Sequence, residues 1–222
     1  MEAHYNDIEL ILPYRYLEEI QIIGSGSIYL SKEMNTNHLT VSIAGSGSFK
    51  APGLKCDQKL SMNIAGSGTM SCSHIQAESL EWRISGSGNI SSSQIDSKEC
   101  KISIAGSGNI SCPKVESEKC DVSIAGSGNI HIAGIQAKEL AGAVAGTLRL
   151  EGEARKANYQ FSGFGKLHAE NCIAQEVTAK CINGEIYCRA EQTLYCEIEH
   201  HGKVFYKGQP NVTYSKDAPQ KF

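Results

Sequence analysis

The chain has 222 residues, a net charge of −3 at pH 7 and a hydrophobic content of 41%. These values are ordinary for a soluble protein, and they lack the basic excess expected of a nucleic-acid-binding domain. No run of about 18 apolar residues occurs, so no membrane insertion is expected. The start of the chain lacks the charged and apolar regions of a signal peptide, which favours a cytoplasmic location.

Residues 1–20 precede a repeated segment and carry an apolar stretch that ends at Pro13. We interpret this segment as an N-terminal cap or an irregular first coil. Solenoid repeats bury their apolar faces against each other, so the two ends of a repeat array need a cover.

From residue 21 onward the sequence repeats with a period of about 20 residues, and such a period is typical of a solenoid. The repeat is marked by the phrase Gly-Ser-Gly. Its second glycine falls at Gly26, Gly47, Gly68, Gly88, Gly108 and Gly128, and weaker copies follow at Gly146, Gly165, Gly184 and Gly202.

Apolar residues recur at fixed distances from each of these glycines. The position two residues after the glycine is apolar in every copy, and the position four residues before it is isoleucine in all six Gly-Ser-Gly copies. Between these positions apolar and polar residues alternate, as in Asp121-Val122-Ser123-Ile124, which is the pattern of a strand with one buried face. We therefore expect two or three short strands in each repeat, with a glycine corner between the first two.

Charged residues alternate in sign from one repeat to the next, which indicates how the repeats stack. Ten residues after the glycine the successive residues are Glu78, Lys98, Glu118 and Lys138. In a parallel stack these positions lie directly above one another, so opposite charges pair and like charges are avoided. A second column, of amides that can hydrogen-bond along the stack, comprises Asn89, Asn109 and Asn129.

These patterns together predict an all-β fold, a single-stranded right-handed parallel β-helix with about 20 residues per coil and roughly nine coils. One domain spans residues 1–222. Its coils occupy residues 21–206, and residues 207–222, with Pro210 and Pro219, form an extended C-terminal closure.

The Gly-Ser-Gly phrase also resembles part of a phosphate-binding loop, but that loop is followed by a helix, and nothing helical follows here. Glycine supplies positive φ at a corner, so we interpret these glycines as structural corners. The serines between them have no His and Asp in matching repeat positions, so no serine nucleophile is expected.

The nine cysteines are an odd number, so at least one thiol is unpaired, which favours a reducing compartment. Their positions in the repeat coincide with apolar columns, and we expect them to pack as small hydrophobic residues rather than to bind a metal. Cys188 aligns with Ile132, and Cys196 aligns with Leu140. Cys100 and Cys120 lie on adjacent coils at a spacing that allows a disulfide, but thiols are expected.

Any specific site is expected where the repeat pattern fails. The weak candidates are His200 and His201, which are adjacent near the C-terminal end, and Tyr187, an exposed aromatic residue. The sequence contains no recognisable pair of catalytic carboxylates, and it predicts no catalytic residue, cofactor or metal site.

The repeated phrase Gly-Ser-Gly-Asn-Ile and the ending Val204 to Pro210 resemble a bacterial family of unknown function labelled "putative auto-transporter adhesin, head domain". The resemblance covers residues 20–214. It implies a right-handed β-helix and a location at the cell surface or in the periplasm, and it supplies no catalytic residue.

Three functions remain open. The first is a non-enzymatic, adhesin-like interaction protein that presents regular faces to a protein or a glycan. The second is a carbohydrate-binding or carbohydrate-active β-helix protein, since solenoid grooves suit extended polysaccharides. The third is a cytoplasmic scaffold that assembles into homo-oligomers. The fold alone does not choose among them.

Overall fold

The computed structural model describes residues 17–163 and 165–222, which form a single sheet of 15 strands. The strands are β1 (Glu19–Gly24), β2 (Ser27–Tyr29), β3 (Met34–Gly45), β4 (Ser48–Gly66), β5 (Thr69–Gly86), β6 (Asn89–Gly106), β7 (Asn109–Cys112), β8 (Lys114–Gly126), β9 (Asn129–Val144), β10 (Thr147–Phe161), β11 (Lys166–Cys181), β12 (Glu185–Ile198), β13 (Lys203–Lys207), β14 (Asn211–Tyr214) and β15 (Gln220–Lys221).

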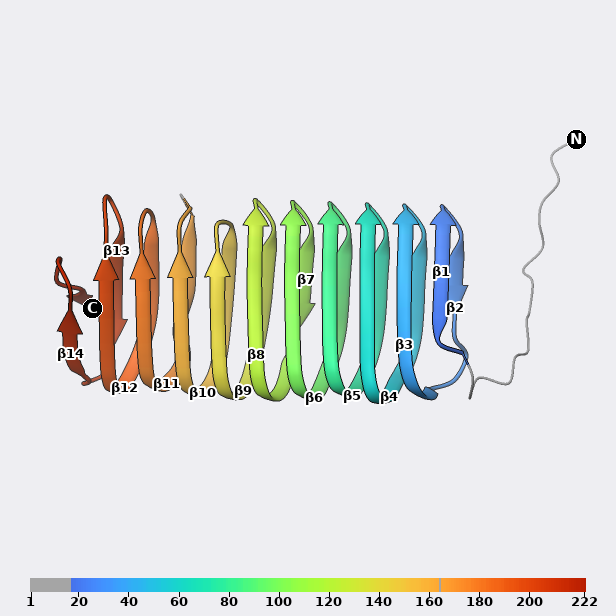
Figure 1. Ribbon diagram of the computed structural model, residues 1–222, viewed down its shortest axis with the longest axis horizontal. Helices are drawn as coiled ribbons and strands as arrows, with labels where there is room; N and C mark the ends of the chain where they lie inside the picture. Colours follow the sequence, from blue (N-terminus) through green and yellow to red (C-terminus); the bar gives the residue numbers. More distant parts are fainter. Residues whose placement is uncertain (1–16, 164) are drawn as a thin grey trace, which may run out of the picture.

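The strands wind into an elongated parallel β-solenoid, and β1 and β14 lie at opposite ends of it (Figure 1). Each strand of the inner coils pairs in parallel with the strand one coil earlier and the strand one coil later, as Ile84 does with Ile64 and Ile104. The molecule has about ten turns of about 20 residues. This confirms the predicted all-β parallel solenoid and its repeat length, with slightly more turns than the nine expected. The right-handed sense of the coil stays a prediction.

Strands in the regular coils are longer than the repeat pattern indicated. β4 runs without a break for 19 residues from one glycine corner to the next, and β5 runs for 18. The expectation of two or three short strands per repeat is therefore wrong for these coils. The pairing skips single positions inside these strands, as at Ser73 and Glu78 of β5 against β6, but it resumes directly afterwards, so the strand does not end there.

The two glycines of each Gly-Ser-Gly corner serve different purposes. The first glycine has positive φ, 129° at Gly86 and 133° at Gly106, a conformation that side chains with a Cβ avoid. The second glycine leaves room for its neighbours: a Cβ on Gly108 would lie 2.6 Å from the carbonyl oxygen of Gly88 and 2.7 Å from Cγ2 of Ile84. The structure thus assigns the positive φ to the first glycine alone, whereas close packing applies to both, since a Cβ on Gly86 would lie 2.5 Å from the carbonyl oxygen of Gly66.

The interior is a continuous column of apolar side chains, and all nine cysteines belong to it as buried free thiols. Cys188 lies in the predicted column, because it pairs with Ala169 and Tyr206. Cys196 does not align with Leu140 as predicted. It pairs with Ala179, because the register shifts between β11 and β12 displace the count by two residues. An even displacement keeps a residue on the same face of a strand, so Cys196 is buried all the same.

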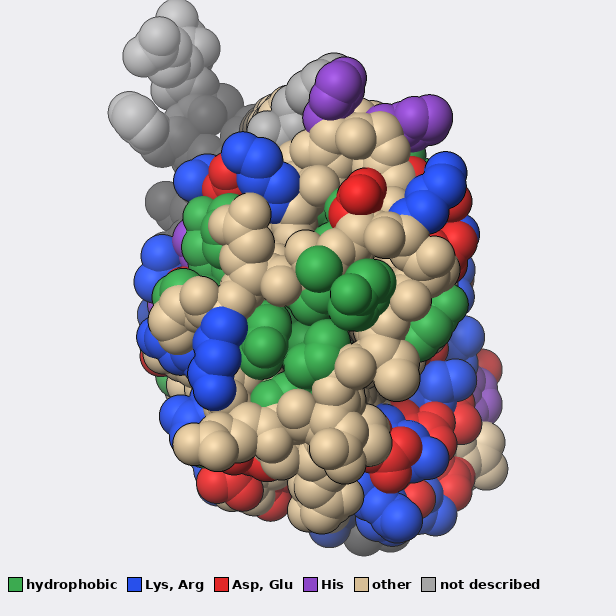
Figure 2. Space-filling model, turned by 90° about the vertical axis from the view of Figure 1, so that its left-hand side faces the viewer, with side chains coloured by type: hydrophobic (Ala, Val, Ile, Leu, Met, Phe, Trp, Pro, Cys, Tyr) green, Lys and Arg blue, Asp and Glu red, His purple; other side chains and the backbone are tan. Residues whose placement is uncertain are grey.

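The two ends of the solenoid differ in what the structure describes. Most of the predicted cap at residues 1–20 lies outside the described residues, and the first coil begins at Glu19. Within the predicted closure at residues 207–222, β14 pairs with β12 and β15 pairs with β13. Figure 2 views this C-terminal end, where apolar side chains gather in the middle and charged ones lie around them. Tyr206 and Val212 pack here, partly buried, against the core.

Candidate functional site

The predicted histidine pair occupies a tight turn that replaces the glycine corner near the C-terminal end. The Gly202 amide donates to the Glu199 carbonyl at 2.9 Å, which closes the turn around His200 and His201. His200 has a φ of 51°, and both side chains are exposed. The turn gives the pair a structural explanation, since Asn, Asp and His tolerate this backbone region better than most residues.

Tyr187 belongs to a stack of side chains on the outside of the last coils. Its ring lies 5.2 Å from the His168 ring and 4.8 Å from the Phe205 ring, nearly parallel to both, and Phe222 packs edge-on at 5.6 Å. Both faces of Tyr187 are therefore covered. Sugars stack on an open aromatic face, so this ring is not a sugar platform.

Among the described residues no hydrogen bond, ion pair or ring contact joins Tyr187 to His200 or His201. Tyr187 instead donates its hydroxyl hydrogen to Glu185 at 2.8 Å. The structure therefore does not bring the three weak candidates of the sequence together.

A more extended feature runs along the solenoid axis on the face opposite the glycine corners. We call it the axial groove. Its floor is one column of small residues, each paired with the next, whose side chains are buried or half-buried and belong to the core or pack against it, so the floor presents no large side chain to solvent. The floor residues are Cys56, Ala77, Ser97, Ser117, Ala137 and Ala154.

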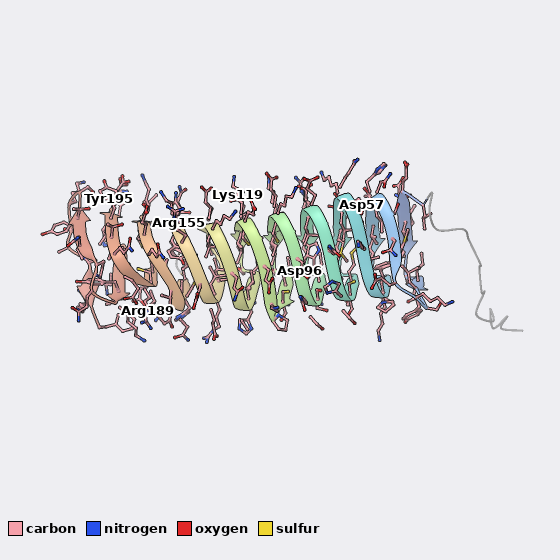
Figure 3. All side chains as sticks on the ribbon, turned by 90° about the horizontal axis from the view of Figure 1, so that it is seen from below. Asp57, Asp96, Lys119, Arg155, Arg189 and Tyr195 are labelled. Carbon is pink, nitrogen blue, oxygen red and sulfur yellow. The ribbon has the colours of Figure 1, made fainter. Side chains whose placement is uncertain are left out.

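Larger polar side chains flank this floor on both sides. One wall comprises Lys55, Gln76, Asp96, Glu116, Gln136 and Glu153, and the other comprises Asp57, Glu78, Lys98, Glu118, Lys138 and Arg155. In Figure 3, which shows the solenoid from below, Asp57 and Arg155 lie toward the upper edge of the view and Asp96 lies nearer its middle.

Ion pairs between neighbouring coils order the second wall. Lys98 Nζ lies 2.6 Å from Glu78 Oε1, and Lys138 Nζ lies 3.0 Å from Glu118 Oε1. Hydrogen bonding to Lys138 lowers the pKa of Glu118, and hydrogen bonding to Glu78 raises the pKa of Lys98. The lowered pKa of Glu118 and the raised pKa of Lys98 keep these two groups charged at neutral pH, and the alternation seen in the sequence forms axial pairs.

Two depressions lie on the axial groove. One of about 550 Å³ is lined by Ser117, Ala137, Lys138 and neighbours as far as Gln175. The other, of about 370 Å³, is lined by Cys56, Ala77, Asp96 and neighbouring wall residues. Because both share the same floor column, the groove offers room to a chain that lies along the axis rather than to a compact small molecule.

The first wall contains a pair of carboxylates that the sequence interpretation missed. Asp96 and Glu116 are direct partners on adjacent coils, so like charges face each other about one strand spacing apart. Gln94 donates to Asp96 at 3.0 Å and His74 lies 3.6 Å from it, while Lys114 Nζ lies 2.6 Å from Glu116. The repeat position eight residues after the glycine, read as a column, would have revealed this pair.

Chemistry in the groove is limited by its surroundings. Burial, and to a smaller extent the charge of Asp57, raise the pKa of the Cys56 thiol to about 11, so this cysteine is not a ready nucleophile. Within residues 17–163 and 165–222 no cluster of His, Cys, Asp and Glu side chains has an arrangement suited to holding a metal ion. The same residues include no helix with the length and apolarity of a membrane span.

Fold and surface together define the class: the chain is a parallel β-solenoid with long polar faces. A family model described as "Putative auto-transporter adhesin, head GIN domain" matches residues 2–134 and, in a second match, residues 108–210. The chain therefore belongs to this family. Neither a curated protein nor a solved structure matched the chain.

Proposed function

We propose that this protein is a non-enzymatic, adhesin-like binding module whose axial groove holds an extended glycan chain. The observation that carries the proposal is the continuous small-residue floor from Cys56 to Ala154, which keeps the groove open over six successive coils. A chain-like ligand can contact one coil after another, so weak contacts accumulate along the groove.

The chemistry of the walls supports a glycan. Carboxylates accept hydrogen bonds from sugar hydroxyls, ammonium and guanidinium groups donate to them, and the amides of Gln76 and Gln136 do both. The walls mix both signs of charge, whereas a nucleic-acid groove needs a basic excess. The membership in an adhesin-labelled family agrees with a binding role.

A glycan array followed by titration of the bound glycans tests this function. We expect binding to oligosaccharides of several sugars and weaker binding as the chain is shortened. Gln136→Tyr places a large ring on an exposed wall position beside the floor and should weaken binding about tenfold or more, the equivalent of about 1.4 kcal/mol. Ser111→Tyr, at an exposed position outside the groove, is the matched control. The proposal fails if no glycan binds, or if both variants bind as well as the wild type.

A second candidate function, a carbohydrate-active enzyme, is favoured by the Asp96–Glu116 pair alone. Carboxyl groups about 5 Å apart are the arrangement of retaining glycosidases. Incubation with the glycans that bind, followed by a reducing-end assay, separates the two functions. Release of reducing ends that Glu116→Gln abolishes would establish the enzyme. Glycans that stay intact would support the non-enzymatic binding module.

A further inference from the structure

Cys100 in β6 and Cys120 in β8 are direct partners on adjacent coils, and their side chains point into the core. Of the nine cysteines, these are the only two that pair with each other in the described register. Leu80 lies one coil before them and Leu140 one coil after, so the two thiols stack inside a closed apolar column.

The geometry of a parallel pair is close to that of a disulfide. Neighbouring strands lie about 4.8 Å apart, within the range of about 4.4 to 6.8 Å that disulfide-linked Cα atoms show. Side chains of directly paired residues run side by side, so the Cβ atoms start at a similar separation. A bridge needs them within about 4.5 Å. The two coils therefore have to approach by a few tenths of an ångström.

We propose that Cys100 and Cys120 are an oxidisable pair that forms a disulfide between adjacent coils when the chain meets a disulfide oxidant. The Cys100 thiolate attacks the oxidant RSSR, which gives a mixed disulfide and releases RS⁻. The Cys120 thiolate then attacks the Cys100 sulfur and releases the second RS⁻. Two protein thiols and one RSSR thus become one protein disulfide and two RSH.

The surroundings determine when this exchange occurs. The neighbouring Cys120 thiol, together with burial, raises the pKa of Cys100, so the thiolate is scarce in the closed solenoid. Exchange therefore takes place while the chain folds or when these coils open. Once formed, the bridge closes a loop of one coil, which restricts the unfolded chain and stabilises the middle of the solenoid.

Refolding in oxidised glutathione, followed by denaturation, alkylation and intact-mass measurement, tests the pair. The number of alkylated cysteines should fall from nine to seven, since one bridge consumes two thiols, and proteolysis should yield one peptide that links Cys100 to Cys120. The midpoint of thermal unfolding should rise by on the order of 5 °C on oxidation.

Matched variants show whether this pair is specific. Cys112→Ala removes a nearby core thiol and should leave the bridge intact, whereas Cys100→Ala should abolish the linked peptide and the rise in Tm. Nine alkylated cysteines in the wild type, or bridges spread over other pairs, would overturn the proposal. The wild-type peptide map decides the question even if a variant does not fold, and none of these outcomes depends on glycan binding.

Discussion

Gly47 lies directly against Ile22 of the preceding coil, and a Cβ on Gly47 would be 2.5 Å from Cγ2 of Ile22 and 2.5 Å from the carbonyl oxygen of Gly26. The contact recurs along the corner, since a Cβ on Gly88 would lie 2.6 Å from Cγ2 of Ile64. The second glycine is thus required by the distance between coils.

This contact predicts the result of a pair of alanine substitutions. Gly47→Ala should destabilise the protein by about 3 kcal/mol, because backbone and isoleucine must both move. Gly26 occupies the same repeat position in the first coil, where no described atom lies within 4 Å of an added Cβ. Gly26→Ala should therefore be close to neutral in urea unfolding, and equal effects at the two glycines would contradict this account of the corner.

The asparagine column allows a second matched comparison. Asn109 donates to Asn89 and accepts from Asn129, both at 3.0 Å, so it takes part in two side-chain hydrogen bonds, whereas Asn129 takes part in one. Asn109→Ala should cost about 1 kcal/mol and Asn129→Ala about half as much. Thermal unfolding of the two variants checks the ratio. A larger loss for Asn129→Ala would show that the amides do not act as a ladder.

The regular coils were predictable because their period is constant. Asn89, Asn109 and Asn129 align by counting residues, and the register confirms the count. The count gives the wrong partner where residues are lost, as for Cys196. The error is not visible in the sequence, because a shift of two residues leaves the polar-apolar alternation unchanged. The strand lengths were not predictable from the repeat pattern, since positions such as Ser73 and Glu78 interrupt the pairing without ending the strand.

The axial groove was harder to predict than the coils. Its floor contains Cys56, Ala77 and Ser97, which do not form a uniform chemical column. Their common property is small size at a bend, and this becomes visible only when the larger neighbours are placed. The Asp96–Glu116 pair was missed for a related reason: Gln76 and Gln136 flank it in the same column, so no charge pattern drew attention to it.

The buried hydroxyl of Tyr159 provides a test of core packing. The ring is buried, its oxygen has no hydrogen-bond partner among the described residues, and burial raises its pKa. Tyr159→Phe removes the unsatisfied hydroxyl and should leave stability unchanged or raise it by about 1 kcal/mol. Trp82→Phe, which also removes an unpaired buried donor but reduces volume, should destabilise. A clear loss of stability in Tyr159→Phe would indicate that the hydroxyl bonds a neighbour such as the Cys172 thiol.

Glu185 predicts a defined pH dependence. Lys166 Nζ lies 2.9 Å from its Oε2, and the Tyr187 hydroxyl donates to the same oxygen at 2.8 Å. Hydrogen bonds from Lys166 and then from Tyr187 lower the pKa of Glu185 below its ordinary value of 4.5. A pKa that is lower in the folded state gives stability that is fully present above the unfolded pKa and is lost as the pH falls through the folded pKa.

Glu185→Gln should therefore destabilise the protein at pH 7, by less than about 1 kcal/mol because the pair lies near the surface. The difference from the wild type should shrink as the pH falls from the ordinary glutamate pKa of 4.5 through the lower pKa of the folded protein, where the wild-type carboxyl takes up its proton. Urea unfolding of both proteins between pH 7 and pH 3 measures this. Tyr187→Phe, which keeps the ring stack and removes one hydrogen bond, should reproduce part of the difference. A gap between wild type and Glu185→Gln that stays constant over this range would show that Lys166 and Tyr187 do not hold the ionised carboxylate.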